Sequence, residues 1–141
     1  MGLSHVIPEL MKKVIEANNG LVDVYSVKHK RTFCYIGDAV EIIQLLAESI
    51  NAIGKVFNVG NDDEEITMGE LAKIIIDLIG KDVDINSMPS TPGSPERRFP
   101  SITKLKEIVI YKKKYPLEKG LKETFSWYNV NVFSGEGVSA I

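Results

Sequence analysis

Arginine side chains at two places in the sequence have the chemistry to bind a phosphorylated ligand. Arg31 stands directly before the short run TFCYI, and Arg97 and Arg98 lie in the proline-rich segment SPERRFPS. A guanidinium group donates paired hydrogen bonds to phosphate oxygens, so two such sites that converge in space could hold a diphosphate. The other interpretation is solvated surface charge, and residue type and spacing alone favour it because most arginines are exposed.

Metal binding and the common catalytic motifs have no support in the sequence. The two histidines, His5 and His29, lack a Cys or His partner at ligand spacing, so each is expected to be a surface or capping residue. The motifs G-x-S-x-G, G-x-x-x-x-G-K and G-x-G-x-x-G after a strand are all missing. The single cysteine, Cys34, lies between two aromatic residues and is expected to be a core residue, with a nucleophilic thiol as the less favoured interpretation.

The composition is that of an ordinary globular protein. The 141 residues carry a formal net charge of -2, and 44% are hydrophobic, enough for one domain with its own core. A nucleic-acid partner would require a strong basic excess, so none is expected. No membrane partner is expected either, because no apolar run could span a bilayer and no signal pattern is present. With a single cysteine, the chain is predicted to be cytoplasmic.

Helical and strand patterns alternate along the chain, which predicts an α/β or α+β fold with a small mixed sheet and flanking helices. Four segments are predicted to be helices, caps included: 6–18, 38–50, 67–79 and 116–128. Four segments are predicted to be strands: 21–25, 33–36, 55–59 and 83–88. Two further segments are predicted to be irregular: a loop over 89–100, and a short helix or turn over 102–108.

Two of these helices begin with a capping-box sequence. Asp38 with Glu41, and Thr67 with Glu70, each place an N-cap residue three positions before a glutamate. The helix after Asp38 is apolar over much of its circumference, so we expect protein to cover it on more than one side. Residues 129–141 have no periodic pattern and are predicted to form a flexible tail.

Six blocks of the sequence, taken in order, resemble one protein family. The blocks are HVIPELMKKVIEANNG, LVDVY, RTFCYIGDAVEIIQLL, KVFNVGNDDEEITMGELAKIIIDLIG, SPERRFPSITKLK and YPLEKGLKETFSWY. They resemble the extended short-chain dehydrogenase/reductases that act on nucleotide sugars, and the nearest branch is similar to UDP-glucuronate decarboxylases. The resemblance covers residues 1–128 and implies the C-terminal, substrate-binding part of such an enzyme, without its full Rossmann domain.

The resemblance implies a role for both arginine sites. Arg31 matches the arginine of the family's R-x-F-x-Y-V-x-D block, and Arg98 matches the arginine before x-P-D; each resembles a diphosphate contact. Val24 and Tyr25 match the strand that lies along the nucleotide base. Residues 1–128 are therefore expected to bind the UDP part of a UDP-sugar. Ser26 departs from the pattern, because the family usually has glycine there.

The resemblance also implies that the reaction needs more than this chain. In the family, an N-terminal Rossmann domain binds NAD through a glycine-rich turn and carries a Tyr-x-x-x-Lys pair. Tyr115 and Lys119 have that spacing, but Pro116 follows the tyrosine and the segment matches a later helix. We therefore expect no catalytic residue here and no cofactor bound by this chain alone.

The sequence and the resemblance leave two functions open, an incomplete enzyme and a non-catalytic module. The first is an incomplete NAD-dependent epimerase, dehydratase or decarboxylase, which binds a nucleotide sugar without catalysis. A complementary Rossmann-domain chain or a homo-oligomer is the expected protein partner, because apolar surface would otherwise be left bare. The alternative is a non-catalytic interaction or oligomerisation module derived from the same fold.

Overall fold

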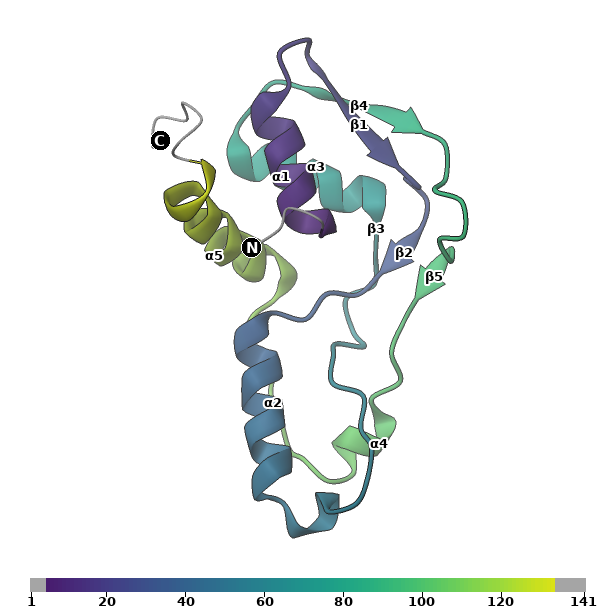
Figure 1. Cartoon of the computed structure of the whole chain (residues 1–141), viewed down its shortest axis with the longest axis vertical. Coiled ribbons are helices and arrows are strands. Elements are labelled where there is room, and N and C mark those ends of the chain that lie inside the picture. The colour runs from purple at the N-terminus through teal and green to yellow at the C-terminus, as the bar shows by residue number, and fades with distance from the viewer. Residues whose placement is uncertain (1–4, 134–141) are drawn as a thin grey trace.

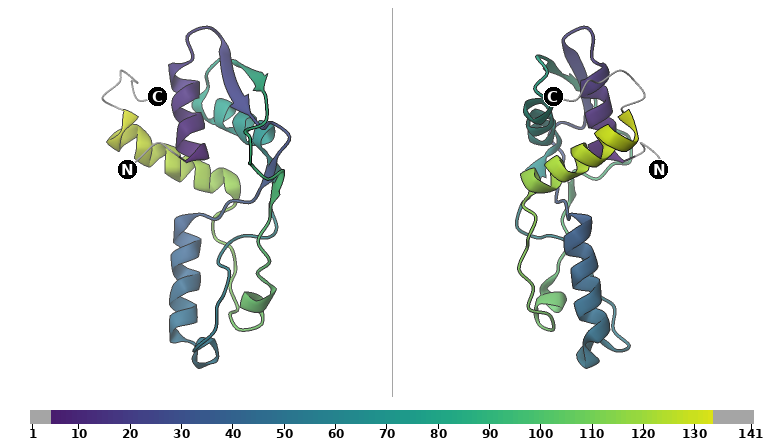
Figure 2. Two further views of the ribbon diagram at one scale, coloured as in Figure 1. Left: turned by 45° about the vertical axis from the view of Figure 1, so that its right-hand side comes forward. Right: turned by 90° about the vertical axis from the view of Figure 1, so that its left-hand side faces the viewer.

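The computed structural model describes residues 5–133, which form two lobes along one long axis (Figures 1 and 2). The upper lobe in Figure 1 holds α1 (Val6–Glu16), β1 (Leu21–Tyr25), α3 (Met68–Ile79), β4 (Asp84–Met88) and α5 (Leu117–Asn131). The lower lobe holds α2 (Ile36–Glu48), the 3-10 helix η1 (Ile50–Ala52) and α4 (Thr103–Lys106). Three short strands lie between them: β2 (Lys30–Arg31), β3 (Ile66–Thr67) and β5 (Arg97–Arg98).

The strands form two small sheets, which confirms the predicted mixed α/β architecture. β1 and β4 pair in parallel, with Leu21 opposite Asp84 and Tyr25 opposite Met88. The second sheet has the order β3-β2-β5, with β2 antiparallel to β3 and parallel to β5. The parallel pairing places Arg31 directly opposite Arg98. Residues far apart in sequence therefore meet at the joint between the lobes.

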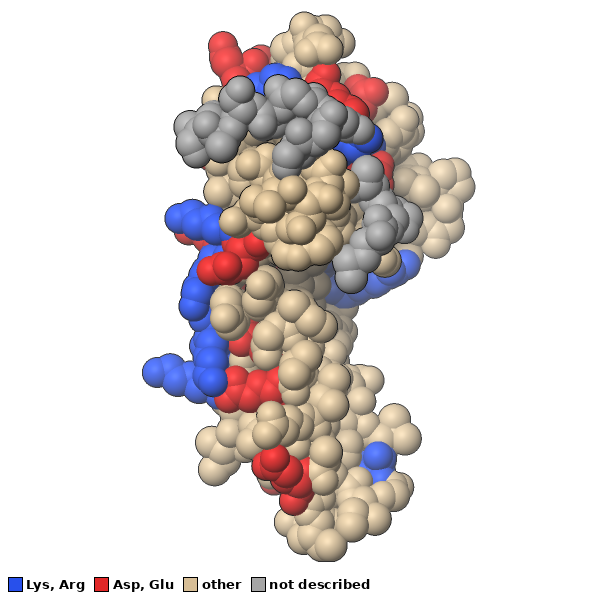
Figure 3. All heavy atoms as spheres, turned by 60° about the vertical axis from the view of Figure 1, so that its left-hand side comes forward, with Lys and Arg blue, Asp and Glu red and all other residues tan. Residues whose placement is uncertain are grey.

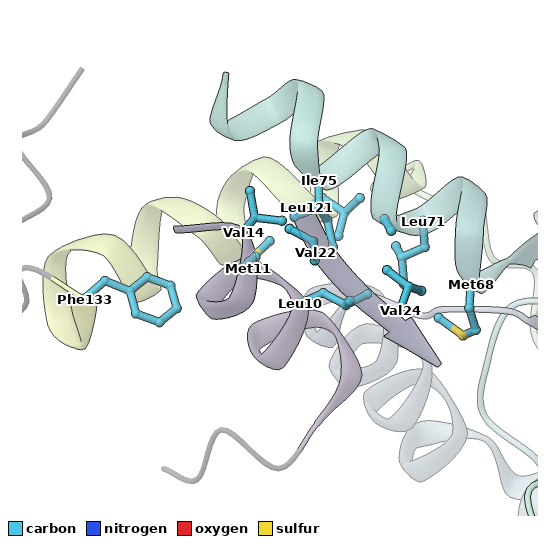
Figure 4. Packing of buried hydrophobic residues seen from close by; sticks show 11 residues of the cluster. Leu10, Met11, Val14, Val22, Val24, Met68, Leu71, Ile75, Leu121 and Phe133 are labelled. Atoms are coloured by element: carbon cyan, nitrogen blue, oxygen red, sulfur yellow. The ribbon is translucent and has the colours of Figure 1, made fainter. Parts of the chain in front are cut away.

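The main hydrophobic core fills the space between α1, α3, α5 and β1 (Figure 4). Apolar residues at helical spacing on α1 and α3 point into it, and the alternating pattern of β1 places two valines there as well. The buried side chains are Leu10, Met11, Val14, Val22, Val24, Met68, Leu71, Ala72, Ile75, Leu121 and Phe133. Each fully buried large side chain contributes about 1.5–3 kcal/mol, so this core holds the upper lobe together.

The lower lobe has a much smaller core, and α2 is largely uncovered. Ile42 is the only buried hydrophobic residue of α2; it packs with residues of the α4 region, namely Ile102, Leu105 and Val109. The expectation that α2 is covered on more than one side is wrong for this chain, since Val40 and Ile43 are each more than half exposed. No helix in the described part of the chain is both long and apolar enough to cross a bilayer.

The sequence predicted helices better than strands. The helices predicted at 6–18, 67–79 and 116–128 are present, and the Thr67–Glu70 capping box forms as predicted, with Glu70 N–H donating to Thr67 Oγ1 at 3.1 Å. Hydrogen bonds from Thr67 lower the pKa of the Glu70 carboxyl. The strand predicted at 83–88 also forms, although it begins one residue later, at Asp84. The strands predicted at 33–36 and 55–59 are wrong, because neither segment finds a strand to pair with: residues 33–35 and 55–59 run as irregular chain, and Ile36 already begins α2.

The C-terminal helix continues beyond the predicted end. α5 extends to Asn131, and Phe133 is only 1% exposed in the main core. The predicted tail therefore starts too early, because an isolated aromatic residue gives no periodic signal although it can fill a core. Residues 134–141 of that tail lie outside the described part of the chain.

Asp38 links the two lobes, and its predicted N-cap role is wrong. The N-cap of α2 is Tyr35, three residues earlier, so Asp38 lies inside the first turn of the helix and is 2% exposed. Its two carboxylate oxygens accept the backbone N–H groups of Lys114 and Tyr115, each at 3.2 Å. Glu41, the expected partner in the capping box, instead pairs with Lys114 Nζ at 2.6 Å. A buried carboxylate needs such donors, and the segment before α5 supplies two.

Ser26 adopts a backbone conformation that glycine usually occupies. Its φ angle is 54°, in the left-handed region, and it starts the turn in which His29 N–H donates to Ser26 O at 2.8 Å. This explains why a glycine is usual here. The serine has a compensating contact, since Thr91 N–H donates to Ser26 Oγ at 3.0 Å.

Substituting Ser26 by alanine and, separately, by glycine should distinguish these two effects. Both variants lose the hydrogen bond to Thr91, at a cost of about 1–2 kcal/mol. Glycine also relieves the left-handed strain, worth about 1 kcal/mol or more. We expect S26A to lower the free energy of unfolding, and S26G to be more stable than S26A by about 1 kcal/mol in urea denaturation. Equal stability of the two variants would contradict the proposed strain.

Substituting Asp38 by asparagine should weaken the joint between the lobes. The amide offers one acceptor oxygen, and its NH2 group would face the second backbone N–H. We expect D38N to lower the free energy of unfolding by about 1–3 kcal/mol in urea denaturation. D63N is the matched control, because Asp63 forms an exposed ion pair with Lys113 and its loss should cost less than about 1 kcal/mol. A D38N protein as stable as the control would argue against this role.

Candidate functional site

An open pocket of about 1040 Å³ lies between α1, β1, β2 and residues 91–100. Its lining includes all four residues singled out from the sequence: Val24, Tyr25, Arg31 and Arg98. β1 supplies the first two, and the paired strands β2 and β5 supply the arginines. Tertiary structure thus brings two distant segments of sequence to one surface.

Val24 and Tyr25 face opposite sides of β1. The Val24 side chain is 2% exposed and points into the main core (Figure 4), so only its backbone can meet a ligand. The Tyr25 ring is 46% exposed and lines the pocket. Among the described strands, β1 pairs only with β4, which leaves its other edge with backbone groups that no strand partner satisfies. Backbone groups at such an edge and an aromatic ring together suit a planar polar ring system.

The Arg31 guanidinium is held by backbone and side-chain oxygens beside it. Nη1 donates to Lys30 O at 2.7 Å and, more weakly, to Glu96 O at 3.4 Å. Nη2 donates to Ser94 Oγ at 3.0 Å and to Pro95 O at 2.8 Å. Burial and, second, the positive charge of Arg98 lower the pKa of Arg31. A bound anion would relieve this repulsion between two neighbouring cations.

Arg97 and Arg98 are neighbours on β5 with different surroundings. Arg97 forms an ion pair with Glu65, Nε to Oε1 at 2.5 Å, and its guanidinium lies 4.6 Å from the centre of the Phe99 ring. The interpretation as a structural surface charge therefore suits Arg97. Arg98 is exposed at the pocket, and its guanidinium makes no hydrogen bond or ion pair with residues 5–133. It is the cation available to an incoming ligand.

Several pocket residues were not singled out from the sequence. Glu9 and Lys13 on α1 form an ion pair at 2.7 Å, and Lys13 Nζ lies 5.4 Å from the centre of the Tyr25 ring. Asp23 on β1 also lines the pocket, and its Oδ1 accepts a hydrogen bond from Asn86 Nδ2 at 2.6 Å. The i, i+4 spacing of Glu9 and Lys13 could have identified an exposed helix face, but only the packing of α1 beside β1 shows that this face borders the pocket.

The expectations for the histidines and the cysteine were partly wrong. His5 is exposed as expected, whereas His29 is only 6% exposed, in the turn after β1. Cys34 is exposed, because the segment around it is not the buried strand that was predicted. Partial burial of its sulfur, and then the charge of Asp38, raise the pKa of the Cys34 thiol, which disfavours a thiolate. Residues 5–133 contain no cluster of three or more His, Cys, Asp or Glu side chains suited to a metal ion.

Tyr115 and Lys119, which have the Tyr-x-x-x-Lys spacing, contact each other in a structural role. The Tyr115 ring stacks on Tyr35 with centroids 4.3 Å apart. Lys119 Nζ lies 4.1 Å from the centre of the Tyr115 ring on the adjoining first turn of α5. Such stacking and cation–π contacts stabilise the joint between the lobes.

The described residues do not fit a dinucleotide cofactor. A strand that binds the phosphates of NAD leads through a glycine-rich turn into a helix N-terminus. β1 leads instead into a turn and β2, and β4 leads into an irregular loop. β3 does run directly into α3, but the Glu70 carboxylate occupies that helix N-terminus. No chemical step on NAD is therefore derived from these residues.

Sequence comparison relates the chain to nucleotide-sugar enzymes. It is 41% identical over 91 residues to UDP-glucuronic acid decarboxylase 6 of Arabidopsis thaliana, covering 64% of this chain and 26% of that protein. It is 32% identical over 130 residues to UDP-N-acetyl-alpha-D-glucosaminuronate decarboxylase of Bacillus cytotoxicus, covering 87% of this chain and 39% of that protein. No protein-family model matches the chain.

Solved structures share its fold. UDP-glucuronic acid 4-epimerase from Bacillus cereus, in complex with UDP-glucuronic acid and NAD, superposes with a TM-score of 0.79 at 22% identity, covering 91% of this chain and 40% of that one. The dTDP-glucose 4,6-dehydratase from Bacillus anthracis, in complex with NAD, gives 0.74 at 25% identity, covering 92% and 40%.

The chain spans between about a quarter and two fifths of the length of these relatives. The block order of its sequence, the mixed α/β fold and the two sets of relatives agree with one another. The chain is a homologue of the UDP-glucuronic acid decarboxylases and of the NAD-dependent nucleotide-sugar epimerases and dehydratases, the extended short-chain dehydrogenase/reductases.

Proposed function

We propose that this chain is the substrate-binding part of an NAD-dependent nucleotide-sugar epimerase, dehydratase or decarboxylase, and that its pocket binds the UDP part of a UDP-sugar. The observation that carries the proposal is the pair of arginines, Arg31 and Arg98, side by side at a pocket that Tyr25 also lines. A diphosphate would offset two adjacent positive charges that have little other compensation. The relatives that act on UDP-linked sugars favour uridine as the base.

The base end of the ligand is proposed to lie along β1. Tyr25 offers an aromatic face, and the open edge of the strand beside Val24 offers backbone donors and acceptors. Buried polar groups of a base need such partners, and backbone groups provide them in fixed positions. This orientation places the phosphates toward Arg31 and Arg98 and the sugar toward the far end of the pocket.

The chain alone is proposed to bind without catalysis. Hydride transfer needs a bound nicotinamide and a positioned acid or base. The described residues provide neither a nicotinamide site nor such an acid or base. The reaction would therefore require a complementary NAD-binding half, from the same longer protein or from a separate chain. The relatives, whose sequences extend well beyond the matched region, are consistent with this division.

The exposed face of α2 supports a protein partner. Ile36, Val40 and Ile43 follow one helix face and are 67%, 54% and 55% exposed. Ile53 and Val56 extend the apolar surface around the end of the lower lobe, where Figure 3 shows few charged side chains. Large apolar patches of this kind mark interfaces in soluble proteins. We propose that the complementary NAD-binding half covers this face.

Titration of the full chain with UDP, followed by amide NMR, tests the binding proposal. We expect localised shift changes at Tyr25, Arg31 and Arg98, because these residues border the same pocket. R98A should weaken binding by about tenfold or more, since a charge-assisted phosphate contact contributes about 1.5–3 kcal/mol. R97A is the matched control, because Arg97 is paired with Glu65, and it should bind UDP nearly as tightly as the wild type. A well-dispersed spectrum that UDP leaves unchanged would refute the proposal.

The partner proposal predicts complex formation with an NAD-binding half. The probe is the N-terminal portion of the Arabidopsis decarboxylase, mixed with this chain and followed by analytical ultracentrifugation. We expect a one-to-one complex that V40D weakens at least tenfold, because the new carboxylate would be buried without a partner. V130D makes the same substitution at an exposed valine of α5, in the other lobe, and should have little effect. Self-association without binding of the probe would assign this face to a second copy of the chain instead.

A further inference from the structure

The loop between β4 and β5, residues 89–96, forms one rim of the pocket and carries a motif that the proposed function does not use. Its sequence is PSTPGSPE, and the chain continues directly into the two arginines of β5. Ser94 is followed by Pro95 and, three positions after the serine, by Arg97, in the order Ser-Pro-x-Arg. This order is the substrate pattern of cyclin-dependent kinases. Such kinases accept proline directly after the serine because proline brings no backbone N–H that needs an acceptor.

The fold presents this motif on an accessible turn. Residues 91–94 form a β-turn in which the Ser94 N–H donates to Thr91 O at 3.1 Å. Proline at the second position of the turn, and glycine with a φ angle of 76° at the third, are typical of type II. Apart from the half-buried Ser94, residues 91–96 are exposed, and the loop 89–96 contains neither helix nor strand. A kinase can therefore bind this segment in an extended form with little loss of packing.

The hydroxyl group of Ser94 already lies beside a cation of the proposed diphosphate site. Arg31 Nη2 donates to Ser94 Oγ at 3.0 Å, and Arg98 lines the same pocket as these two residues. A phosphate group on this oxygen would carry about two negative charges and three strong acceptor oxygens. Guanidinium groups bind such a group through charge-assisted, paired hydrogen bonds. The phosphate would therefore take the cations that a diphosphate ligand needs.

We infer that Ser94 is a phosphorylation site for a proline-directed kinase, and that its phosphate closes the pocket to UDP-sugars by binding Arg31 and Arg98. In the transfer, Ser94 Oγ attacks the γ-phosphorus of ATP and forms the new O–P bond. The bond from this phosphorus to the β,γ-bridging oxygen breaks, ADP leaves, and the hydroxyl proton passes to the base of the kinase. The inference rests on the proposed function, because the phosphate competes with the ligand for the same two cations.

Incubation of the full chain with an active cyclin-dependent kinase and ATP tests the modification. We expect tandem mass spectrometry to locate a phosphate on Ser94. S94A and P95A should each abolish this product, because they remove the acceptor and the required proline. T91A is the matched control, since it removes the neighbouring Thr-Pro acceptor and should leave phosphorylation of Ser94 unchanged. An unmodified wild-type chain, or phosphate on Thr91 alone, would overturn the inference.

The full chain with phosphoserine incorporated at position 94 during translation tests the closure without a kinase. In phosphorus NMR, we expect the second pKa of the phosphate to lie about one unit below its ordinary value of about 6, because nearby guanidinium groups favour the dianion. R98A should return this pKa toward the ordinary value, whereas R97A should leave it unchanged, since Arg97 is paired with Glu65. UDP affinity, measured by calorimetry, should be about tenfold or more below that of the unmodified chain.

Two results of these measurements would overturn the closure: a phosphate pKa that R98A does not change, or UDP affinity that the phosphate does not reduce. If the unmodified chain fails to bind UDP, the proposed function falls. The phosphate pKa in the R98A and R97A variants then decides by itself whether the arginine pair holds the phosphate on Ser94.

Discussion

The segment of residues 26–31, which comprises the β1–β2 connection and β2, holds the other parts of the site in position. Its backbone carbonyls at Val27 and His29 accept the Gly69 and Met68 N–H groups, each at 3.0 Å, which sets α3 against the turn. The approach is so close that a Cβ atom at position 69 would lie 2.7 Å from Val27 Cγ1, so a larger residue there would have to displace the Val27 side chain. The Ser26 and Arg31 side chains of the same segment contact the β4–β5 loop. One short turn thus positions a helix, a pocket rim and a strand.

Electrostatics around β5 explain why two adjacent arginines differ. The acidic run 62–65 pairs with basic side chains of the later segment: Asp62 with Lys106 at 2.8 Å, and Glu65 with Arg97. These contacts tie the two segments together and neutralise Arg97. Arg97 and Arg98 both line the pocket, but Arg98 lies opposite Arg31 and has no acidic partner among residues 5–133. Like charges that remain close together in a folded protein favour an anionic ligand, which is the physical basis of the proposed diphosphate site.

The two lobes differ in how much apolar surface they bury. The upper lobe buries a contiguous core from three helices and a strand, and it presents the pocket. The lower lobe buries little, is joined to the rest through Asp38 and the stacked Tyr35 and Tyr115 rings, and leaves much of α2 exposed. A ligand pocket on the well-packed lobe and an apolar face on the other suit a chain that works against a further protein surface.

The sequence by itself determined the elements whose signals are local. Apolar periodicity identified α1, α3 and α5, the capping box located the start of α3, and alternation identified β1, because these patterns depend only on neighbours in the chain. The order of sequence blocks determined the family resemblance and the candidate residues Val24, Tyr25, Arg31 and Arg98. Only the tertiary structure decided which segments find pairing partners: the two-residue strands β2, β3 and β5 are too short to leave a pattern, and the apolar run at 55–59 stays unpaired. It also decided that Asp38 accepts hydrogen bonds from a segment far along the chain and that Arg31 contacts residues 94–96, because such contacts depend on distances in space.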